Sequence, residues 1–362
     1  MKKTWLSLLT VLFIGTALSA QTKIIYHDAH EFPIIGKYHG EDNYNRFPAK
    51  FKATLRPEVW SLGRNSAGMA VRFRSNASTI AAKWRVLNNA VMGHMAPTGI
   101  KGLDLYAFVN NKWQFVNSGI PKGEYSFQST LLKDGDTTWR EYLLYLPLYD
   151  GVDSLAIGVN ENAIIEKPQQ QLLLDKKPIV YYGSSIAQGA CATRPGLAYT
   201  NILSRQLQRT IINMGFSGQG KFETNVGEAI CETDPALLVI DCNPNTAVEE
   251  IHERAVKLVQ QLRQCKPQTP ILLVENYMYE NAYFEKGKQE LAISKRTELK
   301  KAYNDLRAAG VKNLHYMKGE GFLGDDHEGT VDGVHPTDIG MERFAAHILP
   351  VLKKLLRPGP GL

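Results

Sequence analysis

A serine, an aspartate and a histidine stand at positions where they could carry out acyl transfer. Ser185 follows a short apolar run, residues 178–181, and precedes a helical pattern, so it is expected at the carboxyl end of a strand. Asp332 lies three residues before His335, close enough to orient the imidazole and to stabilise its protonated form. Histidine is the side chain whose ordinary pKa suits removal of a serine proton near neutrality. The three residues therefore predict a nucleophile, its base and the carboxylate that orients the base.

Hydrogen-bond donors for a negatively charged oxygen are expected near the same serine. Attack on an ester carbonyl forms a tetrahedral intermediate whose oxyanion needs preorganised donors. The backbone N–H groups of Ser185 and Gly218 and the side-chain amide of Asn243 could supply them, because residues 213–220 and 241–245 each follow a predicted strand. Asn245 is an alternative to Asn243, or a residue that binds substrate. These donors would complete the machinery for acyl transfer.

Each residue also has a purely structural explanation. Asp332 and His335 could form a surface turn, Asn243 could cap a strand end, and Gly218 could only permit tight turning. Their order along the chain, each at a predicted strand end, favours a catalytic site. Residues 325–328 (Asp-Asp-His-Glu) contain metal-ligand types, yet adjacent side chains point in different directions, which favours a solvated loop. No metal or cofactor is predicted.

The second half of the chain predicts an α/β domain. Short apolar runs alternate there with segments whose apolar residues recur at helical spacing. This alternation predicts a parallel sheet with helices on both faces, a three-layer α/β/α domain over residues 178–357. The expected strands are residues 179–182, 210–214, 236–240, 270–274 and 313–317, and the expected last helix covers residues 338–355.

The first half predicts a different architecture. Alternating apolar and polar residues separated by turn signals indicate a β-sandwich or jelly roll over residues 21–165, with residues 166–177 as a linker. The clearest strand patterns are residues 69–74, 79–84, 103–109 and 141–146. Trp60, Trp84, Trp113 and Trp139 all fall in this half. They favour core positions over an exposed platform for sugar rings.

Composition limits where the chain works and what it binds. Lys2 and Lys3 precede an apolar run that ends at the small residues Ser19 and Ala20, so residues 1–20 resemble a secretory signal peptide and predict a periplasmic or secreted protein. No later segment is long and apolar enough to span a membrane. The formal net charge is +6, and basic and acidic residues are interspersed, so no nucleic-acid stripe is indicated. The oligomeric state is not indicated.

Four cysteines lie in the second half, and export would permit disulfides. Cys191 follows the loop of Ser185, and Cys242 stands beside Asn243. Because both loops should meet at one edge of the sheet, we predict a Cys191–Cys242 disulfide. The alternative is that both are buried thiols.

The segments around Ser185, Gly218, Asn243 and residues 332–341 resemble the blocks of the SGNH or GDSL hydrolase superfamily. Residues 102–106, Gly-Leu-Asp-Leu-Tyr, are similar to the GxDLY signature of the β domain that precedes one bacterial branch of these esterases. The resemblance covers essentially the whole mature chain. It implies a flavodoxin-like hydrolase domain with Ser185 as nucleophile, His335 as base and Asp332 as its orienter. It also implies Gly218 and Asn243 as oxyanion donors.

Two positions depart from the family pattern. Ser184 stands where Gly-Asp-Ser has its aspartate, and residues 241–245 (Asp-Cys-Asn-Pro-Asn) replace Gly-x-Asn-Asp, so Asn245 stays open beside Asn243. His94 is either a loop histidine or a β-domain residue that reaches over the crevice and binds substrate. The resemblance, export and the tryptophans together suggest a carbohydrate O-acetylesterase. The alternatives are a lipase or thioesterase of longer acyl chains, or a carbohydrate-binding protein without activity.

Overall fold

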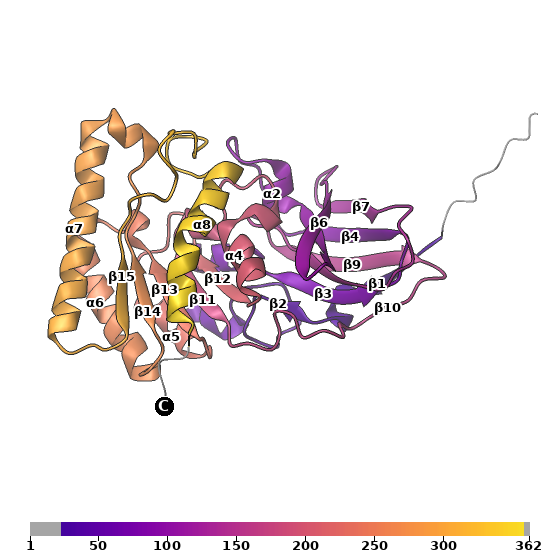
Figure 1. Cartoon of the computed structure of the whole chain (residues 1–362), viewed down its shortest axis with the longest axis horizontal. Coiled ribbons are helices and arrows are strands. Elements are labelled where there is room, and N and C mark those ends of the chain that lie inside the picture. Colours follow the sequence, from indigo (N-terminus) through magenta and orange to yellow (C-terminus); the bar gives the residue numbers. More distant parts are fainter. Residues whose placement is uncertain (1–22, 358–362) are drawn as a thin grey trace, which may run out of the picture.

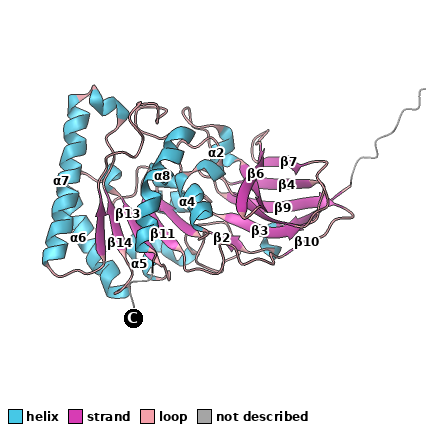
Figure 2. Cartoon of the chain, in the orientation of Figure 1, coloured by secondary structure: helices cyan, strands magenta, loops and turns pink. Residues whose placement is uncertain are grey.

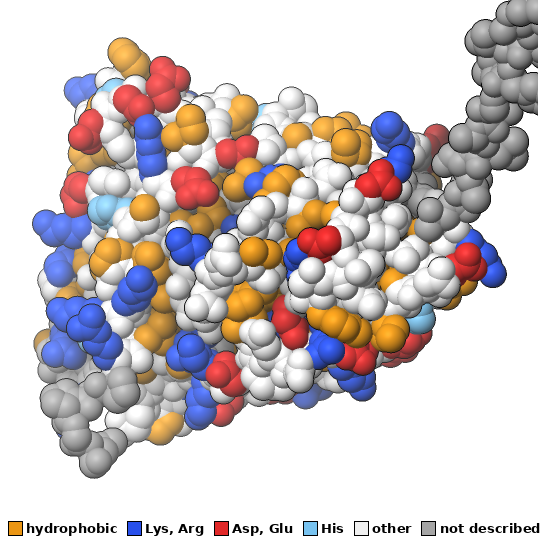
Figure 3. All heavy atoms as spheres, turned by 45° about the vertical axis from the view of Figure 1, so that its right-hand side comes forward, with side chains coloured by type: hydrophobic (Ala, Val, Ile, Leu, Met, Phe, Trp, Pro, Cys, Tyr) orange, Lys and Arg blue, Asp and Glu red, His pale blue; other side chains and the backbone are white. Residues whose placement is uncertain are grey.

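The computed structural model describes residues 23–357, which form two parts along the long axis of the molecule (Figure 1). One part carries antiparallel strands, and the other carries a sheet flanked by long helices (Figure 2). The signal peptide predicted for residues 1–20 lies outside the described residues. Among the described residues, no helix combines the length and the apolar character that a membrane crossing needs. Basic and acidic side chains are interspersed over the face shown in Figure 3.

The N-terminal part is a sandwich of two antiparallel sheets. Phe73 of one sheet and Trp84 of the other share one apolar core. Trp84 is buried as expected, whereas Trp139 is exposed. The first sheet has the order β1 (Ile24–Asp28), β9 (Val152–Asn160), β4 (Ile80–Val86), β7 (Ser126–Leu132). The second has the order β10 (Ile165–Glu166), β3 (Ala70–Ser75), β8 (Arg140–Tyr145), β5 (Leu103–Val109), β6 (Lys112–Gly119), with β2 (Ile34–Ile35) on β3. The predicted antiparallel domain is confirmed.

The C-terminal part is built on a five-stranded parallel sheet. Its order is β12 (Ile211–Gly215), β11 (Ile179–Gly183), β13 (Leu237–Asp241), β14 (Ile271–Val274), β15 (Leu314–Met317). The predicted strands are confirmed to within one residue at each end. Every residue of β11, β12 and β13 is buried, because helices cover both faces of a parallel sheet. Ser185 comes shortly after β11, which lies between β12 and β13 in the sheet.

Helices cover both faces of the sheet. Tyr181 of β11 packs in one core with residues of α4 (Tyr199–Leu207) and α8 (Asp338–Leu355). The next residue, Tyr182, packs in a second core with α5 (Thr224–Cys231), α6 (Val248–Cys265) and α7 (Lys286–Ala308), because successive strand side chains point to opposite faces. Three shorter helices are α1 (Pro57–Gly63), α2 (Pro97–Lys101) and α3 (Ser185–Gln188). The predicted three-layer α/β/α fold is confirmed.

Residues before and within α1 enter the core of the C-terminal part. Phe47, Phe51 and Val59 pack in the same cluster as Tyr182. Arg46 is buried, and its guanidinium donates to the carbonyl oxygens of Asn213 (3.2 Å), Gly215 (2.6 Å) and Leu62 (2.6 Å). Burial lowers the pKa of Arg46 to about 9. The first half of the chain therefore completes the second core instead of only touching it.

The segment expected to be a linker, residues 166–177, is held against the sandwich. The carboxylate of Glu141 accepts hydrogen bonds from the backbone N–H groups of Gln169 (2.9 Å) and Gln170 (3.0 Å). The same carboxylate forms an ion pair with buried Arg72 at 2.9 Å. Leu173 packs beside Tyr145 in a small cluster on the outer side of β8. The connection between the two parts is thus a packed element.

The predicted Cys191–Cys242 disulfide is wrong. Both cysteines are free and buried, and Cys231 and Cys265 are bonded instead. Cys191 belongs to the core on the α4 and α8 side of the sheet, whereas Cys242 belongs to the opposite core. The sheet therefore separates the two thiols. The observed disulfide joins the last residues of α5 and α6, two helices that pack side by side.

Removing the Cys231–Cys265 disulfide should destabilise the fold measurably. The bond closes a loop over a sequence separation of 34, which restricts the unfolded chain. By loop entropy, replacing both cysteines with serine should lower the free energy of unfolding by about 4 kcal/mol. Urea unfolding of the oxidised protein and of the double variant measures the difference. Equal unfolding free energies would contradict it, and replacing Cys191, a free thiol, serves as the control.

Candidate active site

Ser185, His335 and Asp332 lie in hydrogen-bond contact, in that order, at the edge of the parallel sheet. Ser185 Oγ lies 3.0 Å from His335 Nε2, and His335 Nδ1 lies 2.8 Å from Asp332 Oδ2. The chain separates Ser185 from His335 by 150 residues, so the fold alone creates this contact. The series of hydroxyl, imidazole and carboxylate expected from the sequence is therefore present.

The backbone around Ser185 is set by close packing at the end of β11. Ser184 is the N-cap of α3, and its hydroxyl accepts from the N–H of Ile186 at 3.4 Å. A Cβ at Gly220 would lie 2.0 Å from the carbonyl oxygen of Gly183. Only glycine therefore allows the loop after β12 to approach the end of β11. Tyr149, from the sandwich, donates its hydroxyl to the carbonyl oxygen of Ser185 at 3.1 Å. Both halves of the chain thus hold the serine in place.

Asp332 is organised by its own loop. Its Oδ1 accepts from the backbone N–H groups of Val334 (3.0 Å) and His335 (2.7 Å), while Oδ2 faces the imidazole. Gly333 adopts φ +83°, a left-handed conformation that glycine tolerates and that folds the carboxylate back onto the following residues. Partial burial raises the pKa of Asp332, but these three donors lower it more, so the net pKa is below the ordinary value. The carboxylate is therefore charged at neutral pH.

The backbone groups expected to bind the oxyanion lie just after neighbouring strands of the sheet. Ser185 is the first residue of α3, a position whose N–H has no partner within the helix. Gly218, with φ +68°, lies in the turn after β12, and the preceding N–H, that of Ser217, donates to Gln188 Oε1 at 2.9 Å. Within residues 23–357, neither the Ser185 nor the Gly218 backbone N–H donates to a protein acceptor. Both remain available to a ligand.

Of the two candidate asparagines, Asn243 is the better placed. It is fully buried two residues after the end of β13, whereas Asn245 is half-buried at the end of the same 3-10 turn, Asn243–Asn245. The Nδ2 of Asn243 donates one hydrogen bond to Asn276 Oδ1 at 2.6 Å, which fixes the amide and leaves its second N–H free.

His94 comes from the sandwich and reaches the same place. Its ring centroid lies 5.5 Å from that of His335. Cys191 lies beside both histidines, and donor atoms of the three residues are within 4.8 Å of one another. Burial, with a smaller effect from Asp332, raises the pKa of the Cys191 thiol to about 12, so it is neutral at pH 7. His94 is thus a residue of the sandwich that lies beside His335.

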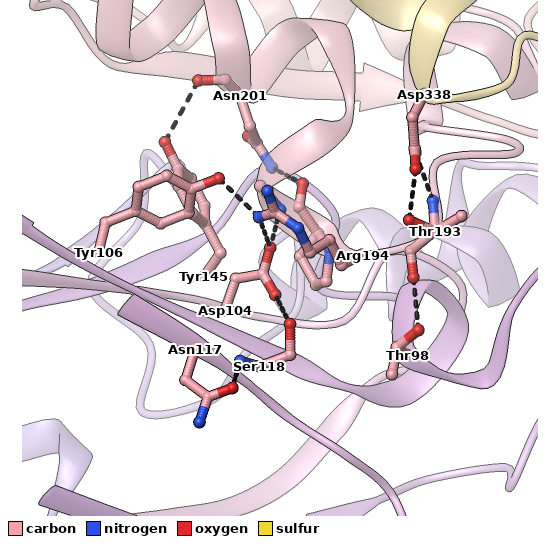
Figure 4. Close-up of polar contacts among 12 residues, drawn as sticks. Thr98, Asp104, Tyr106, Asn117, Ser118, Tyr145, Thr193, Arg194, Asn201 and Asp338 are labelled. Atoms are coloured by element: carbon pink, nitrogen blue, oxygen red, sulfur yellow. Dashed lines mark hydrogen bonds and ion pairs between the residues drawn. The ribbon is translucent and has the colours of Figure 1, made fainter. Parts of the chain in front are cut away.

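Residues 190–196, which follow α3, are clamped between the two halves of the chain (Figure 4). Asp104, from the Gly-Leu-Asp-Leu-Tyr motif, is fully buried and accepts from Arg194 (2.7 Å), the Gly196 N–H (2.8 Å) and the Ser118 hydroxyl (2.7 Å). Arg194 also donates to the Tyr106 hydroxyl at 2.7 Å. The motif aspartate and tyrosine of the sandwich thus bind the segment directly.

The same segment is tied to the loop of the histidine. Thr193 donates its N–H and hydroxyl to the carboxylate of Asp338, at 2.8 and 2.6 Å, and its carbonyl accepts from the Thr98 hydroxyl at 2.5 Å (Figure 4). The N–H of Cys191 donates to the carbonyl oxygen of Pro336, next to His335, at 2.8 Å. One short segment therefore connects the sandwich, the serine and the histidine.

Asp104 and Arg194 should be energetically coupled. Burial raises the pKa of the Asp104 carboxyl, although Arg194, Ser118 and Gly196 all favour its charged form. Asp104→Ala would leave Arg194 and the Gly196 N–H without their acceptor, and should lower the free energy of unfolding by about 3 kcal/mol. Urea unfolding of Asp104→Ala, Arg194→Met and the double variant should give a double-variant loss smaller than the sum of the single losses. Additive losses would show that the two side chains are independent.

Sequence reasoning missed Tyr149, Gln188 and Arg194. Gln188 is fully buried and joins two halves of the site, since its amide also donates to the carbonyl oxygen of Leu148 at 3.1 Å. No motif marks Tyr149 or Gln188. Arg194 could have been suspected as the partner that an aspartate in an apolar strand, Asp104, requires.

Comparisons with known proteins identify the families that the two parts of the chain match. Residues 176–353 match the GDSL-like Lipase/Acylhydrolase family, and residues 24–165 match the family described as the N-terminus of Esterase_SGNH_hydro-type, GxDLY. A protein of Bacteroides ovatus described as a GDSL-like lipase is 40% identical, with a TM-score of 0.88 over 92% of this chain and 98% of its own. No curated protein matches the chain significantly by sequence.

More distant structures share the fold. The salicylyl-acyltransferase SsfX3 of a tetracycline biosynthetic pathway is 17% identical, with a TM-score of 0.69 over 92% of this chain and 94% of its own. A family two carbohydrate esterase of Cellvibrio japonicus is 12% identical, with a TM-score of 0.57 over 92% and 98%. Given the family matches, the Bacteroides ovatus relative and the serine–histidine–aspartate series, this chain belongs to the GDSL-like lipase/acylhydrolase family and is an ester hydrolase.

Proposed function

We propose that the chain is an exported serine esterase that removes a short acyl group, acetyl above all, from a carbohydrate. The observation that carries the hydrolytic step is the contact series Ser185 Oγ, His335 Nε2 and Nδ1, and Asp332 Oδ2, at 3.0 and 2.8 Å. Carbohydrate as the substrate is supported by the similarity of fold to carbohydrate esterases and to an acetyl xylan esterase of Butyrivibrio proteoclasticus. Export is supported by the signal-like residues 1–20.

In the proposed mechanism, His335 Nε2 takes the proton of Ser185 as its oxygen attacks the ester carbonyl. Asp332 accepts the Nδ1–H of His335 and stabilises the imidazolium that forms. The N–H groups of Ser185 and Gly218 and the free amide hydrogen of Asn243 bind the oxyanion. His335 then protonates the departing alcohol, and water, activated by the same histidine, releases the acid and restores the serine.

A small acyl group suits the surroundings of the serine. Ser185 is only 6% exposed, and Tyr149 and Cys191, both buried, lie at the nucleophile helix and beside the histidine. His94, on the side of the sandwich, would donate or accept a hydrogen bond with a hydroxyl of the leaving sugar. The sandwich thereby takes part in substrate recognition, in addition to supporting residues 190–196.

A series of p-nitrophenyl esters tests the acyl preference. The value of kcat/KM should fall by at least about tenfold between acetate and octanoate, because the buried surroundings of Ser185 leave little room for a longer acyl chain. A rise with chain length would instead identify a lipase or thioesterase of long acyl chains. If no ester is cleaved and an organophosphonate does not label Ser185, the carbohydrate-binding alternative holds. Measuring acetate release from a panel of acetylated glycans then identifies the substrate. N-terminal sequencing of the exported chain locates the site at which the signal peptide is removed.

A further inference from the structure

We propose that His94, Cys191 and His335 form a zinc-binding site that reversibly inhibits the enzyme. Donor atoms of these three residues lie within 4.8 Å of one another, and within the described part of the chain they are the only group of this kind. Imidazole nitrogen and cysteine sulfur are the donors that Zn²⁺ favours. The three residues come from distant segments of the chain, so the site exists only in the folded protein.

The distances fit a site that closes slightly around the ion. Zinc bonds of about 2.0–2.1 Å to nitrogen and 2.3 Å to sulfur place neighbouring ligands of a tetrahedron about 3.5 Å apart. Donors up to 4.8 Å apart must therefore draw together by roughly 1 Å. His94 can supply this movement, because it lies in an irregular stretch between β4 and α2. Ser185 Oγ, 3.0 Å from His335 Nε2, stands ready as an oxygen ligand in the fourth position.

A second feature of zinc sites is already in place around His335. Ligating histidines usually bind a carboxylate through the ring nitrogen that does not contact the metal, which fixes the ring and raises its basicity. Asp332 Oδ2 occupies that place, 2.8 Å from Nδ1. The contact leaves Nε2, which lies 3.0 Å from Ser185 Oγ, as the nitrogen available to an ion. The pair that serves catalysis is therefore also the pair that a zinc site requires.

Cys191 supplies a sulfur ligand in addition to the two histidine nitrogens. Its thiol is buried, and its backbone N–H is fixed to the carbonyl oxygen of Pro336 at 2.8 Å. Zinc binding would displace the thiol proton to solvent and form a Zn–S bond, with no change of oxidation state. The ion would occupy Nε2 of His335 and prevent it from accepting the serine proton. This inhibitory consequence depends on the proposed function, whereas metal binding itself does not.

Cobalt is the probe that separates binding from inhibition. Titration of the full-length chain with Co²⁺ should produce a near-ultraviolet thiolate-to-cobalt absorption band, and Zn²⁺ should displace it. The band should be absent in Cys191→Ala and weakened in His94→Ala. Cys242→Ala, which removes the other free cysteine on the opposite side of the sheet, should retain the band. Absence of the band in the wild-type protein, or its persistence in Cys191→Ala, would overturn the proposal.

Inhibition is measured on the same proteins with p-nitrophenyl acetate, each rate being normalised to that variant's own metal-free rate. Zinc should inhibit the wild-type enzyme, a chelator should restore activity, and Cys191→Ala should raise the half-inhibitory zinc concentration by at least about 100-fold. Equal inhibition of wild type and Cys191→Ala would place the ion elsewhere. If the cobalt band forms while no ester is hydrolysed, the zinc site stands and the proposed function fails.

Discussion

Replacing Ser185 with alanine is expected to abolish ester hydrolysis, with a loss in kcat of about 10⁶-fold. The reason is geometric: Ser185 Oγ is the hydroxyl that lies 3.0 Å from His335 Nε2, and alanine leaves the imidazole without a nucleophile to deprotonate. The measurement is the initial rate of p-nitrophenyl acetate hydrolysis, with labelling by an organophosphonate as a second readout. The fold should survive, since alanine fits the space of serine and α3 keeps its N-cap.

Ser184→Ala is the matched control for that experiment. Ser184 is a neighbouring, fully buried serine, but its hydroxyl accepts from the Ile186 N–H, so it acts on the helix terminus. Loss of this cap should cost about 1 kcal/mol of stability while most of the activity remains. If Ser185→Ala hydrolysed the ester at the wild-type rate, or if Ser184→Ala alone lost all activity, Ser185 would not be the nucleophile.

Asp332→Asn should lower kcat by about 10⁴-fold while leaving the protein folded. The amide of asparagine can turn its NH₂ group toward Nδ1 of His335. The imidazole then carries its proton on Nε2, so Nε2 cannot accept the hydroxyl proton of Ser185. Kinetics with p-nitrophenyl acetate give the loss. Asp325 is an exposed carboxylate seven residues before Asp332, so Asp325→Asn is the control and should keep full activity. A loss below tenfold in Asp332→Asn would mean that the carboxylate does not set the state of the imidazole.

The same substitution carries a prediction about pH. The pKa of Asp332 is lower in the folded protein than its ordinary value, so its charge stabilises the folded state above the unfolded carboxyl pKa of about 3.9. That contribution disappears as the pH falls through the lower, folded pKa. Urea unfolding should therefore show Asp332→Asn to be less stable than wild type at pH 7, and the difference should shrink in strong acid. A difference that grows on acidification would contradict the assigned direction of the shift.

The elements that sequence predicts well are those whose signals are local. Four of the five parallel strands, β11 to β14, are buried throughout, so each appears as a largely apolar run, and Asp332 and His335 are close in the chain. Strand β6 is harder to predict from sequence, because most of its residues are at least partly exposed and its pattern is largely polar. Pairing of cysteines depends on which face of the sheet each side chain occupies, and spacing in the chain does not reveal this. The roles of Tyr149 and Arg194 likewise come from contacts between the two halves.

Arg46 and the aromatic residues that follow it have a consequence for how this enzyme can be dissected. Its guanidinium satisfies carbonyl oxygens at the end of β12, and Phe47 stacks on Phe216 with ring centroids 5.3 Å apart. A truncated protein that began near residue 176 would expose this apolar surface and leave those oxygens without donors. The catalytic half is consequently not a portable module: it cannot be recombined with another partner domain unless residues 46–63 travel with it.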